Sequence, residues 1–486
     1  MEQQTKPAFP TRRNELIFGV FALLGGLCLS NFILYGGLNL GFSIAMSAII
    51  ISTAAYLFSR SCKPTAYAAT LLGLSVVICA GFARSDDSFV KFILLLFLAV
   101  SANLGLILTA GQNLHSPAGI GSVLDSFHSL FVLGFGSIEP ACRGIGQTLR
   151  SGKPALKTGG SILLGLAICV PVMAVLIPLL ISADAAFSGV MAQLPQFNLS
   201  DLIVTLLLGL PAALVIYSQA TALRYSEPYQ GQFSEIELSV SHLTINTVLG
   251  GICAVFGVYL LSQIAYFGGG FAGVLPENYT MSEYARRGFF EMAWICALNL
   301  GIIAAAAAFV RPKDGKLPLS TRILCLFIGL VTLFFVVSAS AKMLMYIDAY
   351  GLTRLRVLTE VIMIFFGIAA ATVCLWLFVP KLPYFKVLLL VALIMGATVL
   401  WADVDTVVAD YNVTAYQQGQ LKTVDVEYLI SLGDGAKPHI ARLTEDSNPY
   451  VADAAKKLLD RHPPLDIRDF RSWNYARYWA RDTHAE

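Results

Sequence analysis

Charged residues are scarce in this chain. Asp, Glu, Lys and Arg together make up 13% of its 486 residues, against about 25% in a typical soluble domain. The mean hydropathy is +0.70. A surface that faces water needs far more charge than this, so most of the chain must face a lipid bilayer. The sequence therefore predicts an all-helical, polytopic membrane protein.

The chain also lacks the short motifs that mark common chemistries. It contains no phosphate-binding glycine motif, no HExxH helix and no nucleophile elbow. Its nine cysteines are scattered and never stand at metal-ligand spacing, which is typical of small packing residues. No basic stripe with interleaved aromatic residues suggests nucleic acid. We therefore expect no metal, no cofactor and no nucleic-acid partner, and we assign no catalytic residue.

What the chain does have is about eleven apolar segments. Most are near the roughly 20 residues that cross the hydrocarbon core of a bilayer. The predicted spans are Leu16–Tyr35, Leu40–Phe58, Thr65–Phe82, Phe89–Ala110, Ile162–Ile181, Leu202–Ala222, Leu243–Phe267, Gly288–Val310, Ile323–Tyr346, Val357–Val379 and Val387–Trp401. This divides the chain into a short N-terminal segment (1–15), a transmembrane domain (16–402) and a soluble helical tail (403–486).

The distribution of lysine and arginine predicts the orientation, because short loops rich in these residues stay in the cytoplasm. A cytoplasmic N-terminus places sixteen loop lysines and arginines inside and seven outside, before the tail is counted. An odd number of spans then puts the tail on the extracytoplasmic side. One re-entrant segment in place of a span would reverse this second step.

A long connection, residues 111–158, separates the fourth span from the fifth. Leu124, Phe127 and Phe131 share one helical face, whereas Asp125 and Ser129 do not. This pattern predicts a helix at the cytoplasmic interface, with its apolar face in the lipid and basic residues near the headgroups. A structural role is favoured over a ligand-gating role for His115 or His128.

The tail is predicted to contain a pair of short helices that resembles a fragment of a HEAT-like repeat, followed by a terminal helix rich in aromatic residues and arginine. Leu429, Leu432, Ala436, Ile440 and Leu443 form an apolar set that is interrupted by glycine and proline, and residues 449–459 form a second helix. So small a unit buries little core, so it should dock on the membrane domain or on a partner. The aromatic rings and arginines of residues 469–481 suit either a membrane interface or packing on the helix pair.

The candidate binding cluster is a concentration of polar residues at the predicted outer ends of spans eight to eleven. Its members are Glu283, Arg286, Arg287, Glu291, Lys342, Tyr346, Asp348, Tyr350, Arg354, Arg356, Glu360, Asp403, Asp405 and Asp410. An ionisable group within a span costs about 3 kcal/mol, so several of them persist only if they pair or face a polar cavity. Pairing of Arg287 with Glu291, Arg356 with Glu360 and Lys342 with Asp348 or a later aspartate would be purely structural. In a polar pocket, the same basic residues would attract a phosphate or a carboxylate, while Glu291 and Glu360 would carry protons or cations.

At these residues the chain resembles a bacterial multi-pass membrane family filed as domain of unknown function 4173, with the related 4153 group. The matching stretches are 284–291 (YARRGFFE), 346–355 (YIDAYGLTRL), 403–412 (DVDTVVADYN) and 426–436 (VEYLISLGDGA). An arginine often stands in that family where this chain has Lys342. The resemblance implies a bacterial plasma-membrane location, but it brings no activity, because the function of the family is itself unassigned.

Three functions from different classes follow from these observations. The first is solute or ion handling through the polar cluster, with Asn103, Gln219, Asn246 and Asn299 as candidates for a polar path and a small anionic solute or lipid headgroup as the ligand. The second is a membrane-associated sensor or assembly protein that docks a protein partner through its tail. The third is an enzyme acting on a lipid-linked phosphate, with Asp403 and Asp405 binding a divalent cation. The enzyme is the least favoured, because polytopic membrane glycosyltransferases usually carry an acidic residue in their first outer loop, and residues 36–39 contain none. The lack of an obvious catalytic constellation favours the sensor or assembly protein.

Overall fold

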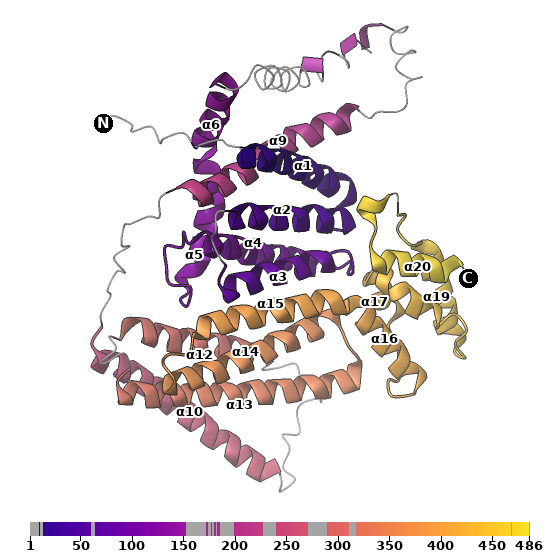
Figure 1. The fold of residues 1–486 in the computed structure, drawn as a ribbon. Coiled ribbons are helices and arrows are strands. Elements are labelled where there is room, and N and C mark those ends of the chain that lie inside the picture. Colours follow the sequence, from indigo (N-terminus) through magenta and orange to yellow (C-terminus); the bar gives the residue numbers. More distant parts are fainter. Residues whose placement is uncertain are drawn as a thin grey trace. The chain divides into compact units, whose positions relative to one another are not determined.

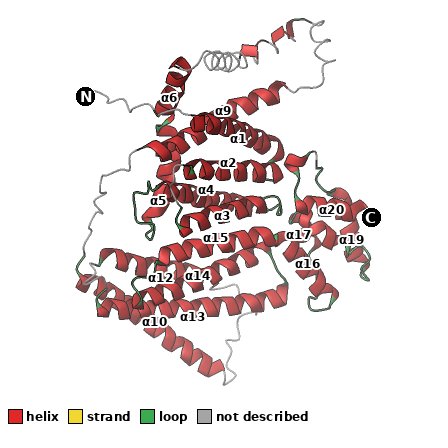
Figure 2. Ribbon diagram, viewed as in Figure 1, coloured by secondary structure: helices red, strands yellow, loops and turns green. Residues whose placement is uncertain are grey.

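The computed structural model describes residues 9, 13–59, 64–151, 199–226, 240–270, 289–310, 317–467 and 469–485, with a few positions between 172 and 184. Within these residues all regular structure is helical and no strand occurs (Figure 2). This confirms the predicted fold class. The chain divides into two compact units: residues 1–230 together with 466–478, and residues 231–465 together with 479–486.

The first unit is built on a set of apolar helices that pack side by side (Figure 1). They are α1 (Arg13–Gly36), α2 (Leu40–Phe58), α3 (Ala66–Gly81), α4 (Ser88–Ala110) and α9 (Leu199–Tyr225). Small residues let α1 approach α9 closely, because a Cβ placed on Gly26 would lie only 2.5 Å from the backbone nitrogen of Ala213. Close approach over small residues is the usual way in which membrane helices associate.

A broken helix connects α4 to the next part of the first unit. It consists of α5 (Gly121–Phe127), the π-helix η1 (His128–Phe135) and α6 (Ile138–Ser151). The two parts, Gly121–Phe135 and Ile138–Gln147, bend by 43° at the break, and together they are long and apolar enough to form a span. The predicted apolar face is confirmed, since Leu124, Phe127 and Phe131 are exposed while Asp125 and Ser129 are buried.

The second unit is also built on long apolar helices. They are α10 (His242–Gly270), α12 (Phe289–Phe309), α13 (Leu319–Tyr350), α14 (Arg354–Phe378) and α15 (Tyr384–Ala402). Helices α13 and α14 form an antiparallel hairpin whose turn is Gly351–Thr353. Its core includes Phe335, Ala339 and Met363, which are almost fully buried.

The tail helices of the second unit follow α15 directly. They are α16 (Val404–Gln417), α17 (Val426–Ser431), the 3₁₀ turn η2 (Asp434–Ala436), α18 (Lys437–Ala441) and α19 (Pro449–Arg461). The predicted apolar set is confirmed, because Leu429, Leu432, Ala436, Ile440 and Leu443 are all buried in one core with residues of α16. The division of the chain at residue 402 stays a prediction.

A segment after α19 belongs to the first unit. Residues 466–478, which we call the strap, include the 3₁₀ turn η3 (Phe470–Ser472) and the first turn of α20 (Tyr475–Ala485). Phe470 packs edge-on against Phe32 of α1, with ring centroids 5.6 Å apart. The sequence predicted either a membrane interface or packing on the helix pair for these aromatic residues; Trp479 packs on His439 of the helix pair, and the membrane interface stays a prediction.

Nine helices in the described residues are long and apolar enough to cross a membrane, or ten if the broken helix is one span. They coincide with nine of the eleven predicted spans. The third predicted span is the apolar helix α3, which has only 16 residues. The fifth, Ile162–Ile181, lies almost entirely outside the described residues.

Candidate functional site

Most of the predicted polar cluster can be located in the second unit. Lys342, Tyr346, Asp348 and Tyr350 lie on the last turns of α13, and Arg354, Arg356 and Glu360 lie on the first turns of α14. Glu291 is exposed in the first turn of α12. Glu283, Arg286 and Arg287 lie outside the described residues.

The central contact of the cluster is an ion pair between Arg354 and Asp405. The guanidinium donates from Nε to Oδ1 and from Nη2 to Oδ2, and both distances are 2.7 Å. The Asp405 side chain is 4% exposed and that of Arg354 is 32% exposed. A two-bonded arginine–carboxylate pair is strong and geometrically specific. It holds α16 against the start of α14, although the two residues are 51 positions apart.

Two further polar contacts hold α16 and α17 to the same hairpin turn. The Asn412 side chain accepts a hydrogen bond from Leu352 N and donates one to Leu352 O, both at 2.8 Å. The backbone N–H of Arg354 donates to the Tyr428 hydroxyl at 2.8 Å. Gly351 adopts a left-handed conformation with φ of 75°, and a Cβ there would lie 2.3 Å from Asn412 Oδ1. The turn therefore requires glycine for both its backbone and its contact with α16.

Arg356 and Glu360 are not engaged as the sequence predicted. Arg356 donates to the carbonyl oxygens of Tyr350, at 3.2 Å, and Gly351, and its guanidinium lies 4.1 Å from the ring centroid of Tyr346. Glu360 Oε2 is buried and has no hydrogen-bond partner among the described residues. The expected Arg356–Glu360 pair is thus wrong, because the carbonyl groups at the end of α13 compete for the guanidinium.

The three aspartates of the tail each have a different partner. Asp405 binds Arg354, whereas Asp410 pairs with Arg442 at 2.9 Å. Asp403, in a left-handed conformation with φ of 53°, accepts from the Thr406 hydroxyl at 2.7 Å. No three His, Cys, Asp or Glu side chains in the described part of the chain are arranged to hold a metal ion.

His439 adds a titratable group to the tail core. Its ring packs edge-on against Trp479, with centroids 5.1 Å apart, and its Nδ1 lies 3.1 Å from Asp410 Oδ1. Burial lowers the pKa of His439 below its ordinary value of 6.5, and the nearby Asp410 only partly opposes this shift. Asp410 is half-exposed and shared with Arg442, so its effect is weak.

We predict that acid destabilises the tail through His439. Below pH 6.5 the unfolded tail binds a proton that the folded tail does not, so stability falls as the pH drops from 6.5 towards the lowered pKa. The slope is at most about 1.4 kcal/mol per pH unit. Thermal unfolding between pH 7.5 and 5.5 measures it, with H439F as the variant that keeps the ring contact. An equal slope in H439F would assign the effect to another group.

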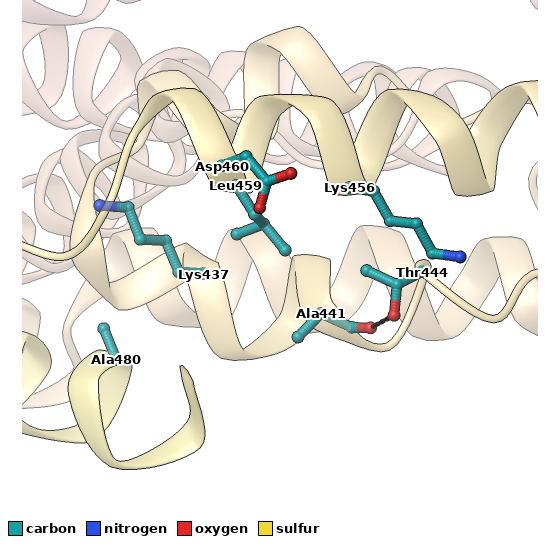
Figure 3. Close-up of a pocket in the computed structure, with 7 residues that line it drawn as sticks. All are labelled: Lys437, Ala441, Thr444, Lys456, Leu459, Asp460 and Ala480. Carbon is teal, nitrogen blue, oxygen red and sulfur yellow. Dashed lines mark hydrogen bonds between the residues drawn. The ribbon is translucent and has the colours of Figure 1, made fainter. Parts of the chain in front are cut away.

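A buried ion pair between Lys437 and Asp434 joins the η2 turn to the residues that follow α19, and we call these contacts the Asp434 motif. Lys437 donates to Asp434 Oδ1 at 2.5 Å and to Pro463 O at 2.9 Å, while Leu465 N donates to Asp434 Oδ2 at 3.1 Å. A shallow hollow beside it is lined by Lys437, Ala441, Thr444, Lys456, Leu459, Asp460 and Ala480 (Figure 3). The ammonium groups of Lys437 and Lys456 point away from each other at its two ends (Figure 3). The two ammonium groups therefore do not converge on one point of the hollow.

The first unit contains a second polar cluster, which the sequence did not predict. Asn474 of the strap is fully buried and donates to Ser85 O at 2.7 Å and to Asn39 Oδ1 at 3.2 Å. Lys91, which is 4% exposed, donates to the same oxygen at 2.8 Å. Arg477 pairs with Asp86 at 2.8 Å. The strap is thus held at the α1–α2 loop and the α3–α4 loop, at one end of the unit.

A family described as a domain of unknown function, DUF4153, matches residues 45–443. The match covers most of the chain and includes the α13–α14 hairpin, α16 and the Asp434 motif. The chain belongs to the DUF4153 family. No curated protein and no solved structure matches it. The strap and Asn39 lie outside the region that matches DUF4153.

The four amide residues proposed as a polar path also lie within the DUF4153 match. Gln219 donates to Asn103 at 2.5 Å, which joins α9 to α4. Asn246 bonds Ser320 at 2.8 Å, and Asn299 donates to Thr332 at 3.0 Å, so both join neighbouring helices to α13. Each amide therefore stabilises helix packing within its own unit.

Proposed function

We propose that this DUF4153 protein is a membrane-embedded assembly or regulatory protein that presents its C-terminal tail to a protein partner. The Arg354–Asp405 pair carries the proposal, because it holds the tail on the α13–α14 hairpin. Asn412 and Tyr428 add to the same contact. Of the three functions, docking is the one that best fits polar groups that are already paired with each other.

We further propose a bacterial plasma membrane with the N-terminus in the cytoplasm and the tail outside. The asymmetry of lysine and arginine between the loops supports this orientation. The strap supports the external side of the tail, because it binds the α1–α2 and α3–α4 loops, which a cytoplasmic N-terminus and one crossing by each of α1 to α4 put outside. The proposed relation to the 4173 family rests on the motif resemblance.

Cysteine accessibility tests the orientation. On a background without native cysteines, Y450C in the tail and F470C in the strap should react with a membrane-impermeant maleimide in intact cells. Both side chains are exposed, at 87% and 57%. K381C, in the α14–α15 loop, should react only in inverted vesicles. Reaction of Y450C or F470C only in inverted vesicles would overturn the proposed side of the tail.

Photocrosslinking tests the docking function. A crosslinking residue at Tyr450, which is largely exposed, should give a discrete adduct in intact cells, and the adduct should be lost when R354A releases the tail. The same residue at Lys381 is the control. An adduct that is unchanged by R354A would separate partner binding from the hairpin contact, and the absence of any adduct would contradict docking.

Ion handling is the second candidate, and it rests on Glu360. Its Oε2 is buried without a hydrogen-bond partner among the described residues, and ionisable groups inside a span often mark an ion route. E360Q should therefore abolish ion flux into proteoliposomes that contain the protein. Loss of flux with intact crosslinking would show that the two candidate functions are separate, and equal flux in E360Q would contradict this role.

A further inference from the structure

The chain enters and leaves the broken helix beside the same end of α9. Before the helix, Gln112 Nε2 donates to the carbonyl oxygen of Ser226, the residue after α9, at 2.6 Å. After the bend, Pro140 O accepts from Phe9 N at 3.2 Å, and the Phe9 ring stacks on Tyr225, the last residue of α9. The segment between residues 112 and 140 therefore starts and finishes on one side of the bundle.

That side is the one on which α1 begins, because α1 and α9 are antiparallel. The Tyr225 hydroxyl donates to Glu15 in the first turn of α1. Near the other ends of the two helices, Asn31 Nδ2 donates to Thr205 Oγ1 at 3.2 Å. In Figure 1 the broken helix runs across the ends of α1, α2 and α9, not alongside them.

The broken helix reaches half-way along its neighbours. Ser126 Oγ donates at 3.0 Å to the carbonyl oxygen of Val100, ten residues before the end of α4. Ser218 of α9 donates to Gly134 O, and a Cβ on Gly134 would lie 3.2 Å from Val215 Cγ1, ten residues before the end of α9. Ten helical residues rise about 15 Å, which is half of a hydrocarbon core of about 30 Å.

The burial of α4 shows the same division into halves. All residues from Ser101 to Ile107 are buried, whereas Phe89, Phe92 and Leu96 in the first half are exposed. A helix that crossed the whole bilayer beside α4 would contact both of its halves. The broken helix therefore covers its neighbours over the depth of one leaflet.

The face of the broken helix that is turned away from the bundle is aromatic. Phe127, Phe131 and Phe135 stack one above the other, with ring centroids 6.4 and 6.2 Å apart, and each is at least half exposed. We call these three side chains the phenylalanine ladder. The polar side chains of Asp125 and Ser129 are buried on the opposite face. Polar groups at membrane depth are tolerated where protein covers them.

We propose that the broken helix is a re-entrant element, which enters one leaflet and leaves it on the same side, and that its phenylalanine ladder binds the acyl chains of that leaflet. Lipid is the occupant, because the ladder lies within the depth of the hydrocarbon core and is level with the exposed Leu214 of α9. The orientation proposed above makes this the cytoplasmic leaflet. The contact with lipid does not depend on that orientation or on the docking function.

Cysteine labelling of the full chain tests whether the helix returns. Three single-cysteine proteins are compared: one keeps the exposed native Cys142 of α6, and the others carry F58C or F470C. Arg224 donates to Tyr56 O at 2.9 Å, which places the end of α2 beside the end of α9. An impermeant maleimide should therefore reach Cys142 and F58C from the same side of the membrane, and F470C from the other. Reaction of Cys142 on the side of F470C would show a spanning helix and overturn the proposal.

Nitroxide labels on F127C, F131C and F135C test the contact with lipid. Their depth in vesicles follows from collisions with oxygen and with a water-soluble nickel complex. Since Ser126 and Gly134 both lie ten residues from the ends of their partner helices, we expect the outer two labels at depths within about 3 Å of each other. A spanning helix would separate them by about 12 Å, eight residues of helical rise.

The control label is L207C on α9, where Leu207 is 68% exposed. Ladder labels should collide with oxygen as often as this control. Much rarer collisions with oxygen would show that protein, such as a second copy of the chain, covers the ladder, and frequent collisions with nickel would show water; either result would overturn lipid binding. The Cys142 experiment needs no substitution in the broken helix, so it remains decisive if a ladder variant fails to fold.

Discussion

Replacing Arg354 with alanine is expected to release α16 from the α13–α14 hairpin. The substitution leaves the Asp405 carboxylate, which is 4% exposed, without its cation. Removing one partner of a buried pair costs roughly 3–5 kcal/mol, and we expect about 3 kcal/mol here because Arg354 is partly exposed. This corresponds to an approximately 100-fold rise in the population of the open state.

The reaction of a cysteine at position 409 measures this release. Ala409 is fully buried on the face of α16 that carries Asp405 and Asn412, so A409C reacts with a maleimide only when α16 opens. We expect R354A to raise its reaction rate about 100-fold. R442A is the matched control, because it removes a surface pair with Asp410 that is worth about 0.5 kcal/mol.

The alternative outcome is equally specific. If R354A and R442A raise the reaction rate of A409C by similar small factors, the Arg354–Asp405 pair does not hold the tail. The exchanged pair R354D/D405R should recover part of the wild-type rate, because it restores the charges but not the hydrogen bonds of the original environment. No recovery would indicate that the damage from R354A lies in packing rather than in charge.

The second large effect is expected at Asn474, where leucine should detach the strap from the first unit. Asn474 is fully buried, and leucine has a similar volume but cannot donate to Asn39 or Ser85. Each buried acceptor that loses its partner costs about 1–3 kcal/mol. Lys91 still donates to Asn39, so we expect a total near 2 kcal/mol and an approximately 30-fold rise in opening.

The reaction of A476C with a maleimide reports the opening of the strap, because Ala476 is only 1% exposed. Y478F is the matched control on the same helix, since Tyr478 is half-exposed. A rate in N474L equal to that in Y478F would mean that the aromatic contacts, and not the amide network, hold the strap. N474Q should give an intermediate rate, because it keeps the amide but displaces it.

Local structure in this chain was largely predictable. The spans follow from uninterrupted apolar segments, whose length and composition are read without knowledge of any partner. The buried apolar set from Leu429 to Leu443 and the outward face of Leu124, Phe127 and Phe131 follow from helical periodicity. Glu360 was also singled out from sequence, because a carboxyl group in an apolar helix is unusual.

The contacts between polar side chains were not predicted correctly from the sequence. One of the two alternatives from the sequence paired Arg356 with Glu360, which are four residues apart on one helix, but the guanidinium reaches the carbonyls at the end of α13 instead. Arg354 and Asp405 were both named, yet they were assigned to a phosphate and a cation rather than to each other. The sequence did not point to Asn39, Lys91 and Asn474 as a cluster, because single polar residues near span ends are common in membrane proteins.

The sequence by itself determined that this protein is a helical membrane protein with a small helical tail, because hydropathy and helical periodicity depend on near neighbours along the chain. Only the tertiary structure decided which polar groups meet. Asn474 bonds Asn39 across 435 positions, and His115 finds Asp125 through a loop. Such contacts depend on how the helices pack and on the path of the loops between them. A pattern of residue types along the chain does not show which residues will meet in this way.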